Sequence, residues 1–217
     1  MNIRPVYFAG YWLTRILSWL LFRPMIIGAE NVPRKGGFIL ASNHISYYDP
    51  PVVGSWQPRR LYFFAKKELF KNPLFGAVLR ACNALPVKRG TIDRQAMERA
   101  VDAVHRGFGL TFFPEGTRSR TNEFLPVKAG LGIVAHAAVC PIVPAYLHGT
   151  NRLMDCLRRR TRMAIAYGAP LSAEWVKSFS QDKAGYKALS EAVMQQITIL
   201  REQVKSLQKR SSVSDQN

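Results

Sequence analysis

Six short apolar segments alternate with stretches of helical pattern, and this alternation constrains the fold more than any other feature of the chain. The segments are rich in β-forming residues and bounded by glycine or proline; they span residues 37–41, 60–65, 83–87, 109–113, 141–147 and 162–167. Strands that alternate with helices form layered sheets. We therefore expect a single layered α/β domain with a mixed, mostly parallel sheet flanked by helices.

Three further segments carry a helical pattern. In residues 91–106, Thr91 is expected to cap the helix and Gly107 to end it, with apolar residues forming one stripe between them. Residues 127–138 are expected to form a second, shorter apolar helix. Over residues 186–207, apolar side chains recur at steps of three and four, which is typical of one long amphipathic helix.

Residues 5–22 form an almost wholly apolar run that Arg15 interrupts. A signal peptide is disfavoured because no small-residue cleavage site follows, and a transmembrane span because the run is short and charged in its middle. At helical spacing Tyr11, Thr14, Arg15 and Ser18 fall in one narrow stripe. This pattern favours an N-terminal membrane-associating helix with its arginine reaching lipid phosphates. A helix buried in the domain core is the alternative.

The remainder of the chain contains no internal repeat and no linker that would divide it. With 217 residues, the chain has the size of one ordinary α/β domain. We expect residues 1–24 to form the apolar membrane-interface helix and residues 25–210 to form the α/β domain. Residues 211–217 are expected to be a flexible tail.

The charge balance indicates an anionic partner. Lysine and arginine total 31 against 14 acidic residues, a net charge of +17. Such an excess favours nucleic acid, an acidic membrane surface or phosphorylated ligands. Basic residues cluster at 59–71 and 158–162, where they would attract anionic lipid. Aromatic residues interleaved with arginines in residues 59–64 suit a nucleic-acid-binding module, but they lie in an expected buried strand.

Common catalytic and metal-binding motifs are absent from the sequence. It contains no GxxxxGK[ST], GxSxG or HExxH motif. Its three cysteines form no Cys-x-x-Cys pair, so neither a disulfide framework nor a thiolate zinc site is expected, and a reducing environment fits. The pattern Gly130-x-Gly132-x-x-Ala135 follows an expected loop rather than a strand. We interpret it as close helix packing rather than a dinucleotide site.

A first polar block, residues 42–51, directly follows the expected strand 37–41 and contains His44 and Asp49. Loops at strand ends are where α/β proteins place reacting groups. A turn between the two residues would bring the carboxylate onto the ring Nδ1–H and leave Nε2 free as a general base. Capping of a new helix by Asp49 is the alternative, because two prolines follow it.

A second polar block, Phe113-Pro114-Glu115-Gly116-Thr117-Arg118, follows the expected strand 109–113. Gly116 permits an unusual backbone conformation, and Arg118 offers the planar, bidentate recognition of phosphate that lysine lacks. Taken alone, the block also fits a solvated basic turn.

Together the blocks resemble the glycerolipid acyltransferase family, with agreement in order and spacing over residues 25–170. The matching parts are N-H-x4-D at Asn43, His44 and Asp49, a second block with Lys66 and Arg89, F-P-E-G-T-R at residues 113–118, and a fourth block at residues 139–150. The resemblance implies transfer of a fatty acyl group from acyl-CoA or acyl-carrier protein to the free hydroxyl of a lysophospholipid. The acceptor it favours is 1-acylglycerol-3-phosphate, which gives phosphatidic acid.

The resemblance also implies roles for individual residues. His44 would remove the proton of the acceptor hydroxyl, and Asp49 would stabilise the imidazolium that forms. No cofactor, metal or enzyme nucleophile is implied, because a thioester is already activated. Residues expected to bind the acceptor or shape its phosphate site are Asn43, Lys66, Arg89, Glu115, Gly116, Thr117 and Arg118.

A phospholipid membrane is the expected partner, because the lipid acceptor resides there; we expect association with the cytoplasmic face of the cell membrane and no nucleic acid partner. A different lyso-lipid acceptor stays open. So does a non-catalytic basic lipid- or nucleic-acid-binding module, although a mere binder would not need His44.

Overall fold

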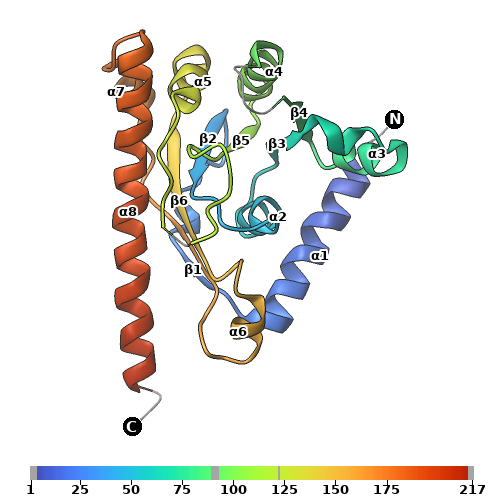
Figure 1. Cartoon of the computed structure of the whole chain (residues 1–217), viewed down its shortest axis with the longest axis vertical. Coiled ribbons are helices and arrows are strands. Elements are labelled where there is room, and N and C mark those ends of the chain that lie inside the picture. Colours follow the sequence, from blue (N-terminus) through green and yellow to red (C-terminus); the bar gives the residue numbers. More distant parts are fainter. Residues whose placement is uncertain (1–3, 89–92, 122, 215–217) are drawn as a thin grey trace.

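A seven-stranded sheet forms the centre of the computed structural model, which describes residues 4–88, 93–121 and 123–214 (Figure 1). Its strand order is β1-β7-β6-β2-β5-β3-β4. The strands are β1 Met25–Ile27, β2 Phe38–Ser42, β3 Leu61–Lys66, β4 Ala84–Val87, β5 Gly109–Phe112, β6 Ile142–His148 and β7 Ala164–Tyr167. Only β6 and β7 pair antiparallel among these described strands, which confirms the expected mixed, mostly parallel sheet.

All six expected strands are present, and β1 is the addition. It has three residues and pairs in parallel with β7, Met25 opposite Ala164. A strand this short shows no recognisable alternation of apolar and polar residues, so the sequence does not predict it. Within β3, Tyr62 packs edge-on against Phe108, and Phe64 packs edge-on against Phe112. These rings therefore contribute to packing within the domain rather than to a surface on which nucleic-acid bases could stack.

Helices cover both faces of the sheet. They are α1 Arg4–Phe22, α2 Asp49–Ser55, α3 Pro73–Ala81, α4 Arg94–His105, α5 Gly130–Ala138, α6 Leu153–Leu157, α7 Ala173–Lys177 and α8 Lys183–Ser214, with short 3-10 turns at Ala29–Asn31 and Lys67–Phe70. One core packs α4, α5 and α8 against Ile39 and Ala41 of β2. The other packs α2 against Phe38 and Leu40 of the same strand, because successive side chains point to opposite faces.

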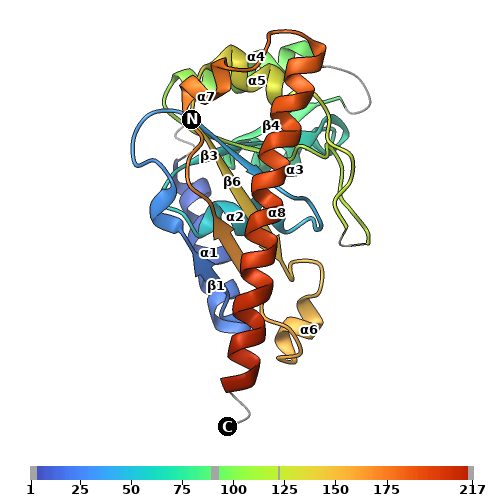
Figure 2. The same cartoon turned by 90° about the vertical axis from the view of Figure 1, so that its left-hand side faces the viewer.

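The long helix α8 packs along one face of the molecule, as Figure 2 shows. Its contact with α5 is close at Gly132, where a Cβ atom would lie 2.3 Å from the Tyr186 carbonyl oxygen. This confirms the interpretation of the Gly-x-Gly-x-x-Ala pattern as helix packing. The helix continues to Ser214, four residues into the segment expected to be a tail; residues 215–217 lie outside the described residues.

Helix α4 begins later than expected. The side chain of Asp93 caps it by accepting a hydrogen bond from the Ala96 N–H (3.1 Å), whereas the expected cap, Thr91, lies outside the described residues. Gly107 follows the helix with φ +84°, a left-handed conformation that suits a helix stop.

Helix α1 turns its polar stripe toward α2. Tyr11 donates its hydroxyl proton to the Gln57 carbonyl (3.1 Å), Arg15 donates to the Ser55 carbonyl (3.3 Å), and Ser18 accepts from the Trp56 indole N–H (2.9 Å). The expectation that Arg15 reaches lipid phosphates is therefore wrong, because its guanidinium donates to the Tyr11 hydroxyl and the Ser55 carbonyl of the protein itself.

The opposite face of α1 is apolar and exposed. Leu13 is 59% exposed and Trp19 is 56% exposed, and their neighbours on this face are similarly open. Within the described residues, no helix combines the length and apolar character that crossing a bilayer requires. Burial of α1 in the domain core, the alternative drawn from the sequence, does not describe this face.

Candidate active site

Three loops meet at one edge of the sheet because β2, β5 and β6 run parallel and end there (Figure 1). The loop after β2 carries His44 and leads to Asp49, the loop after β5 carries Glu115 and Arg118, and the turn after β6 carries Thr150. Carboxyl ends of parallel strands are the usual location of sites in open α/β sheets.

His44 and Asp49 form a buried hydrogen-bonded pair. The ring Nδ1 lies 2.8 Å from Asp49 Oδ2, and the side chains are 8% and 0% exposed. The ring stacks on Phe113 with 4.0 Å between centroids and 16° between planes. These contacts fix the ring, and the geometry expected from the spacing of the two residues is present.

Asp49 is the first residue of α2 rather than its cap. Its carboxylate turns back to the preceding loop, where Oδ2 also accepts the N–H groups of Ile45 (2.6 Å) and Ser46 (2.7 Å). The hydroxyl of Thr150 donates to Oδ1. The alternative reading of Asp49 as a helix cap is therefore wrong. Four donors surround a carboxylate without solvent contact.

This arrangement assigns the histidine tautomer. A carboxylate oxygen that already accepts two N–H groups requires Nδ1 to be a donor as well, so Nε2 of the neutral ring is the acceptor. Within the described residues, no hydrogen bond occupies Nε2. The ring nitrogen is therefore free to take a proton from a bound hydroxyl.

Thr150 was not singled out by the sequence-based reasoning. Its position is the last residue of the block 139–150, which could have drawn attention to it, but a lone threonine after a strand carries no specific signal. The contact with Asp49 joins residues 101 positions apart, so only the assembled sheet reveals it.

Glu115 joins the two loops of the site. Its Oε1 accepts the His44 N–H (2.9 Å), its Oε2 accepts the Leu125 N–H (2.8 Å), and the residue is 1% exposed. Burial raises the pKa of Glu115, and those two hydrogen bonds oppose the rise. Both oxygens are therefore engaged by backbone N–H groups, which is a positioning role, and a direct contact of Glu115 with substrate stays a prediction.

Asn43 likewise has a scaffold position. Its amide donates to the Leu147 carbonyl (3.0 Å) and accepts the Leu147 N–H (2.8 Å), and the residue is 1% exposed. Both ends of the amide are thus engaged by β6, and a contact of Asn43 with substrate stays a prediction. This clamp holds the end of β2 beside the end of β6.

Arg118 is an expected site residue whose guanidinium is open to a ligand. Its guanidinium lies 3.4 Å from the ring centroid of Tyr47, and no hydrogen bond or ion pair occupies it within the described part of the chain. The next residue, Ser119, donates its N–H to the His44 carbonyl (2.8 Å). Arg118 is therefore held beside the histidine loop with its N–H groups free.

The other expected residues lie around these. Gly116 adopts φ +68°, the left-handed conformation that favours glycine, and Thr117 is exposed. Lys66 is exposed at the carboxyl end of β3, two strands and thus roughly 10 Å across the sheet from β2. Arg89 lies outside the described residues.

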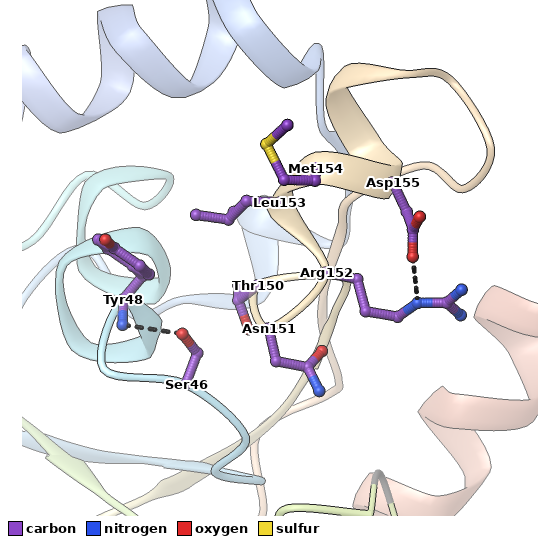
Figure 3. A pocket seen from close by; sticks show the side chains of 8 residues that line it. All are labelled: Ser46, Tyr48, Thr150, Asn151, Arg152, Leu153, Met154 and Asp155. Carbon is purple, nitrogen blue, oxygen red and sulfur yellow. Dashed lines mark hydrogen bonds and ion pairs between the residues drawn. The ribbon is translucent and has the colours of Figure 1, made fainter.

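A pocket of about 390 Å³ adjoins the pair on the side of Thr150 (Figure 3). Figure 3 shows Leu153 extending toward α2, while Arg152 turns away and pairs with Asp155 at 2.9 Å. The residues that line this pocket are Ser46, Tyr48, Thr150, Asn151, Arg152, Leu153, Met154 and Asp155. Within the described residues, no group of three or more histidine, cysteine, aspartate or glutamate side chains could hold a metal ion.

Comparisons with known proteins identify the family of this chain. A family model described as Acyltransferase matches residues 23–148. The 1-acyl-sn-glycerol-3-phosphate acyltransferase of Bacillus subtilis (strain 168) is 29% identical over 184 residues, which are 84% of this chain and 90% of that protein. A lyso-ornithine lipid O-acyltransferase of Pseudomonas aeruginosa is 30% identical over 140 residues, 63% of this chain and 52% of that protein.

A solved structure shares the fold. It is the crystal structure of the 1-acyl-sn-glycerophosphate (LPA) acyltransferase PlsC from Thermotoga maritima, which superimposes with a TM-score of 0.67 at 25% identity. The match covers 92% of this chain and 79% of that one. The layered sheet is therefore common to both.

Proposed function

Because the chain belongs to the acyltransferase family, whose model matches its residues 23–148, we propose that it is an enzyme that acylates lysophosphatidic acid. The reaction moves a fatty acyl group from a thioester to the free hydroxyl of 1-acylglycerol-3-phosphate and gives phosphatidic acid. The observation that carries the proposal is the buried His44–Asp49 pair, 2.8 Å between Nδ1 and Oδ2, with Nε2 left open.

The chemistry follows from this pair. Nε2 of His44 takes the proton of the acceptor hydroxyl while the hydroxyl oxygen attacks the thioester carbonyl carbon. The carbon–sulfur bond then breaks, and the imidazolium returns its proton to the departing thiolate. Asp49 stabilises the imidazolium, and a positioned proton transfer of this kind contributes about 10²–10⁴-fold. No cofactor is needed, because the thioester supplies the activated acyl group.

Arg118 and Lys66 are proposed to hold the acceptor phosphate. Stacking on Tyr47 orients the guanidinium of Arg118 without using its N–H groups, which suits bidentate contact with phosphate. Lys66 adds an exposed positive charge at the same edge of the sheet. Arg89 and Thr117 are proposed on the strength of the family motif alone.

The acyl donor is proposed to be acyl-CoA or acyl-carrier protein. Both present the same thioester to the site, and the general base acts on the acceptor in either case. The described residues therefore favour neither donor over the other.

We further propose that the protein lies on a membrane surface through α1. The helix contacts α3 and α6, and these also expose apolar side chains, with Leu74 of α3 77% exposed and Met154 of α6 58% exposed. Exposed apolar side chains on three neighbouring helices are typical of interfacial binding. The free cysteines Cys82, Cys140 and Cys156 fit a reducing compartment, so the cytoplasmic face is the proposed side.

The direct test is transfer of a radiolabelled acyl group to several lyso-lipids, with acyl-CoA and acyl-carrier protein as separate donors. We expect label in phosphatidic acid with the wild type and its loss in His44→Ala. Lyso-ornithine lipid is included because a relative is named for it. Absence of transfer to every lyso-lipid by folded wild-type protein would refute the proposal, and label in the ornithine lipid alone would refute the acceptor.

A further inference from the structure

A second pocket, of about 550 Å³, lies at the opposite edge of the sheet from the His44–Asp49 pair. Its lining is Tyr7, Phe8, Tyr11 and Trp12 of α1, Pro58, Arg59 and Arg60 before β3, and Gly107 and Phe108 before β5. The amino ends of β2, β3 and β5 are in register at Gly109. β2 runs from Phe38 to Ser42, roughly 13 Å, and His44 lies beyond its carboxyl end, so the two sites are distinct.

Arg60 is the notable side chain of this pocket. Its guanidinium lies 5.4 Å from the ring centroid of Tyr7 and 5.3 Å from that of Phe108. Among the residues that the structure describes, it has no hydrogen-bond or carboxylate partner, and its Nε is buried without one. The two rings hold the cation in place while its hydrogen-bonding capacity stays unused.

Arg59, one residue earlier, differs completely. Its guanidinium donates hydrogen bonds to the carbonyls of Pro33 (2.5 Å), Gly36 (2.8 Å) and Gly107 (2.6 Å). It is therefore a structural residue that ties three loops together. Both residues belong to the basic cluster expected at residues 59–71 to attract lipid. The guanidinium of Arg59 is already bound to backbone carbonyls, whereas that of Arg60 is available to a ligand.

The surroundings favour an anionic ligand. None of the pocket-lining residues is acidic, and the nearby Arg106 is paired with Asp102 at 3.1 Å. A guanidinium fork matches phosphate oxygens in a way that a lysine does not. Phe8 and Trp12 at the pocket belong to the exposed apolar face of α1, 45% and 54% exposed, so the ligand that suits both has a phosphate and an apolar part.

We propose that this pocket binds an anionic membrane lipid and that the Arg60 guanidinium contacts the phosphate group of that lipid. This site is separate from the one that carries out acyl transfer. The inference rests on the proposed seating of α1 at a membrane surface and not on the acyl-transfer chemistry. A bound lipid would anchor the amino-terminal half of α1 while the apolar face of the helix enters the interface.

The test is flotation of the full-length protein with vesicles of phosphatidylcholine alone and with vesicles in which a fifth of the lipid is phosphatidylglycerol. Arg60→Met removes the cation and keeps an unbranched apolar stem, and Arg60→Lys keeps the charge without the fork. Arg99→Met is the matched control: it removes one charge from the exposed surface of α4, a helix that packs on the other face of the sheet.

We expect Arg60→Met to reduce partition onto the anionic vesicles by about tenfold, the effect of one charge-assisted hydrogen bond. Binding to phosphatidylcholine should change little, because the choline cation of that lipid offsets the charge of its phosphate and repels the Arg60 guanidinium. Arg60→Lys should fall between wild type and Arg60→Met. Arg99→Met should change little, because charges beyond about 8–10 Å are screened. If Arg60→Met and Arg99→Met lost vesicle binding equally, or if Arg60→Lys bound like the wild type, net charge alone would explain the effect. Either result would refute the proposed lipid site.

Two further measurements separate the explanations. Inorganic phosphate, compared with chloride at matched ionic strength, should leave vesicle binding intact; selective displacement by phosphate would show a site for the free anion and overturn the lipid proposal. Transfer to a short-chain, monomeric acceptor should be unaffected by Arg60→Met, so loss of the lipid site is distinguishable from failure of the proposed activity. If Arg60→Met does not fold by circular dichroism, Arg60→Gln takes its place.

Discussion

Replacement of Asp49 by asparagine separates two effects of this carboxylate: its hydrogen bonds, which hold the His44 tautomer, and its negative charge, which stabilises the imidazolium. The position of Oδ2 receives three donors, the His44 Nδ1–H and the N–H groups of Ile45 and Ser46, whereas the position of Oδ1 receives one, the Thr150 hydroxyl. An asparagine amide group cannot face three donors, so its oxygen must take the first position. Its NH₂ group then faces the threonine hydroxyl, which can rotate to accept.

The substituted site therefore keeps the histidine tautomer and loses only the negative charge. A hydrogen bond to a charged group contributes about 1.5–3 kcal/mol and a neutral one about 0.5–1.5 kcal/mol. The difference, about 1–2 kcal/mol, is the stabilisation of the imidazolium that Asp49→Asn loses, which corresponds to a roughly 5- to 30-fold lower kcat. His44→Ala removes the proton transfer itself and should lose about 10²–10⁴-fold.

The assay is steady-state acyl transfer to 1-acylglycerol-3-phosphate by the two single variants and by their combination. The combined variant should be no slower than His44→Ala, because Asp49 acts through the ring. Asp102→Asn, on the exposed surface of α4, removes the same charge and should leave kcat unchanged. If Asp49→Asn were as slow as His44→Ala in a folded protein, the argument that two backbone N–H groups secure the tautomer would be refuted.

Three other variants test the remaining parts of the site and surface. Arg118→Ala should raise the acceptor KM about tenfold, the effect of losing a charge-assisted hydrogen bond to phosphate; a raised donor KM with unchanged acceptor kinetics would move Arg118 to the thioester side. Glu115→Gln should lower the free energy of unfolding by about 1–3 kcal/mol, because its NH₂ group must face one of the two N–H donors now bound. Because burial raises the pKa of Glu115, the folded wild type holds that proton more tightly than the unfolded chain, and its stability should fall as pH rises from about 4 through the raised pKa. Urea unfolding across this range should show that component in the wild type and not in Glu115→Gln. Exchange of the exposed Leu13 and Leu20 for glutamate should abolish flotation with vesicles without lowering the melting temperature, and retained flotation would contradict the role given to α1.

Much of the fold can be predicted from the sequence because its signals are local. Segments such as 37–41 and 141–147 are short, apolar and bounded by glycine or proline, and they form β2 and β6 within a residue or two. The contact between His44 and Asp49 is also local, since five residues and a turn suffice to bring a carboxylate onto a ring. Residues this close in sequence meet with little loss of chain entropy, so their spacing is informative.

Other features were decided only when the sheet assembled. Glu115 reaches the His44 N–H across 71 residues, Asn43 clamps Leu147 across 104, and Thr150 completes the environment of Asp49 across 101. Each of these three polar side chains follows a strand, and the sequence alone offers substrate contact as readily as loop anchoring for such a position. Only strand order and register determine which backbone group each one meets.

Helix α1 marks the same boundary between the two kinds of information. Its sequence determines that one narrow stripe is polar and the rest apolar. The sequence does not determine which of the two sides packs against the rest of the protein. The tertiary structure supplies α2, whose last turn and following loop expose the carbonyls of Ser55 and Gln57 and the indole N–H of Trp56. These groups need hydrogen-bond partners when they are covered, so the polar stripe packs against α2 and the apolar face is left pointing outward.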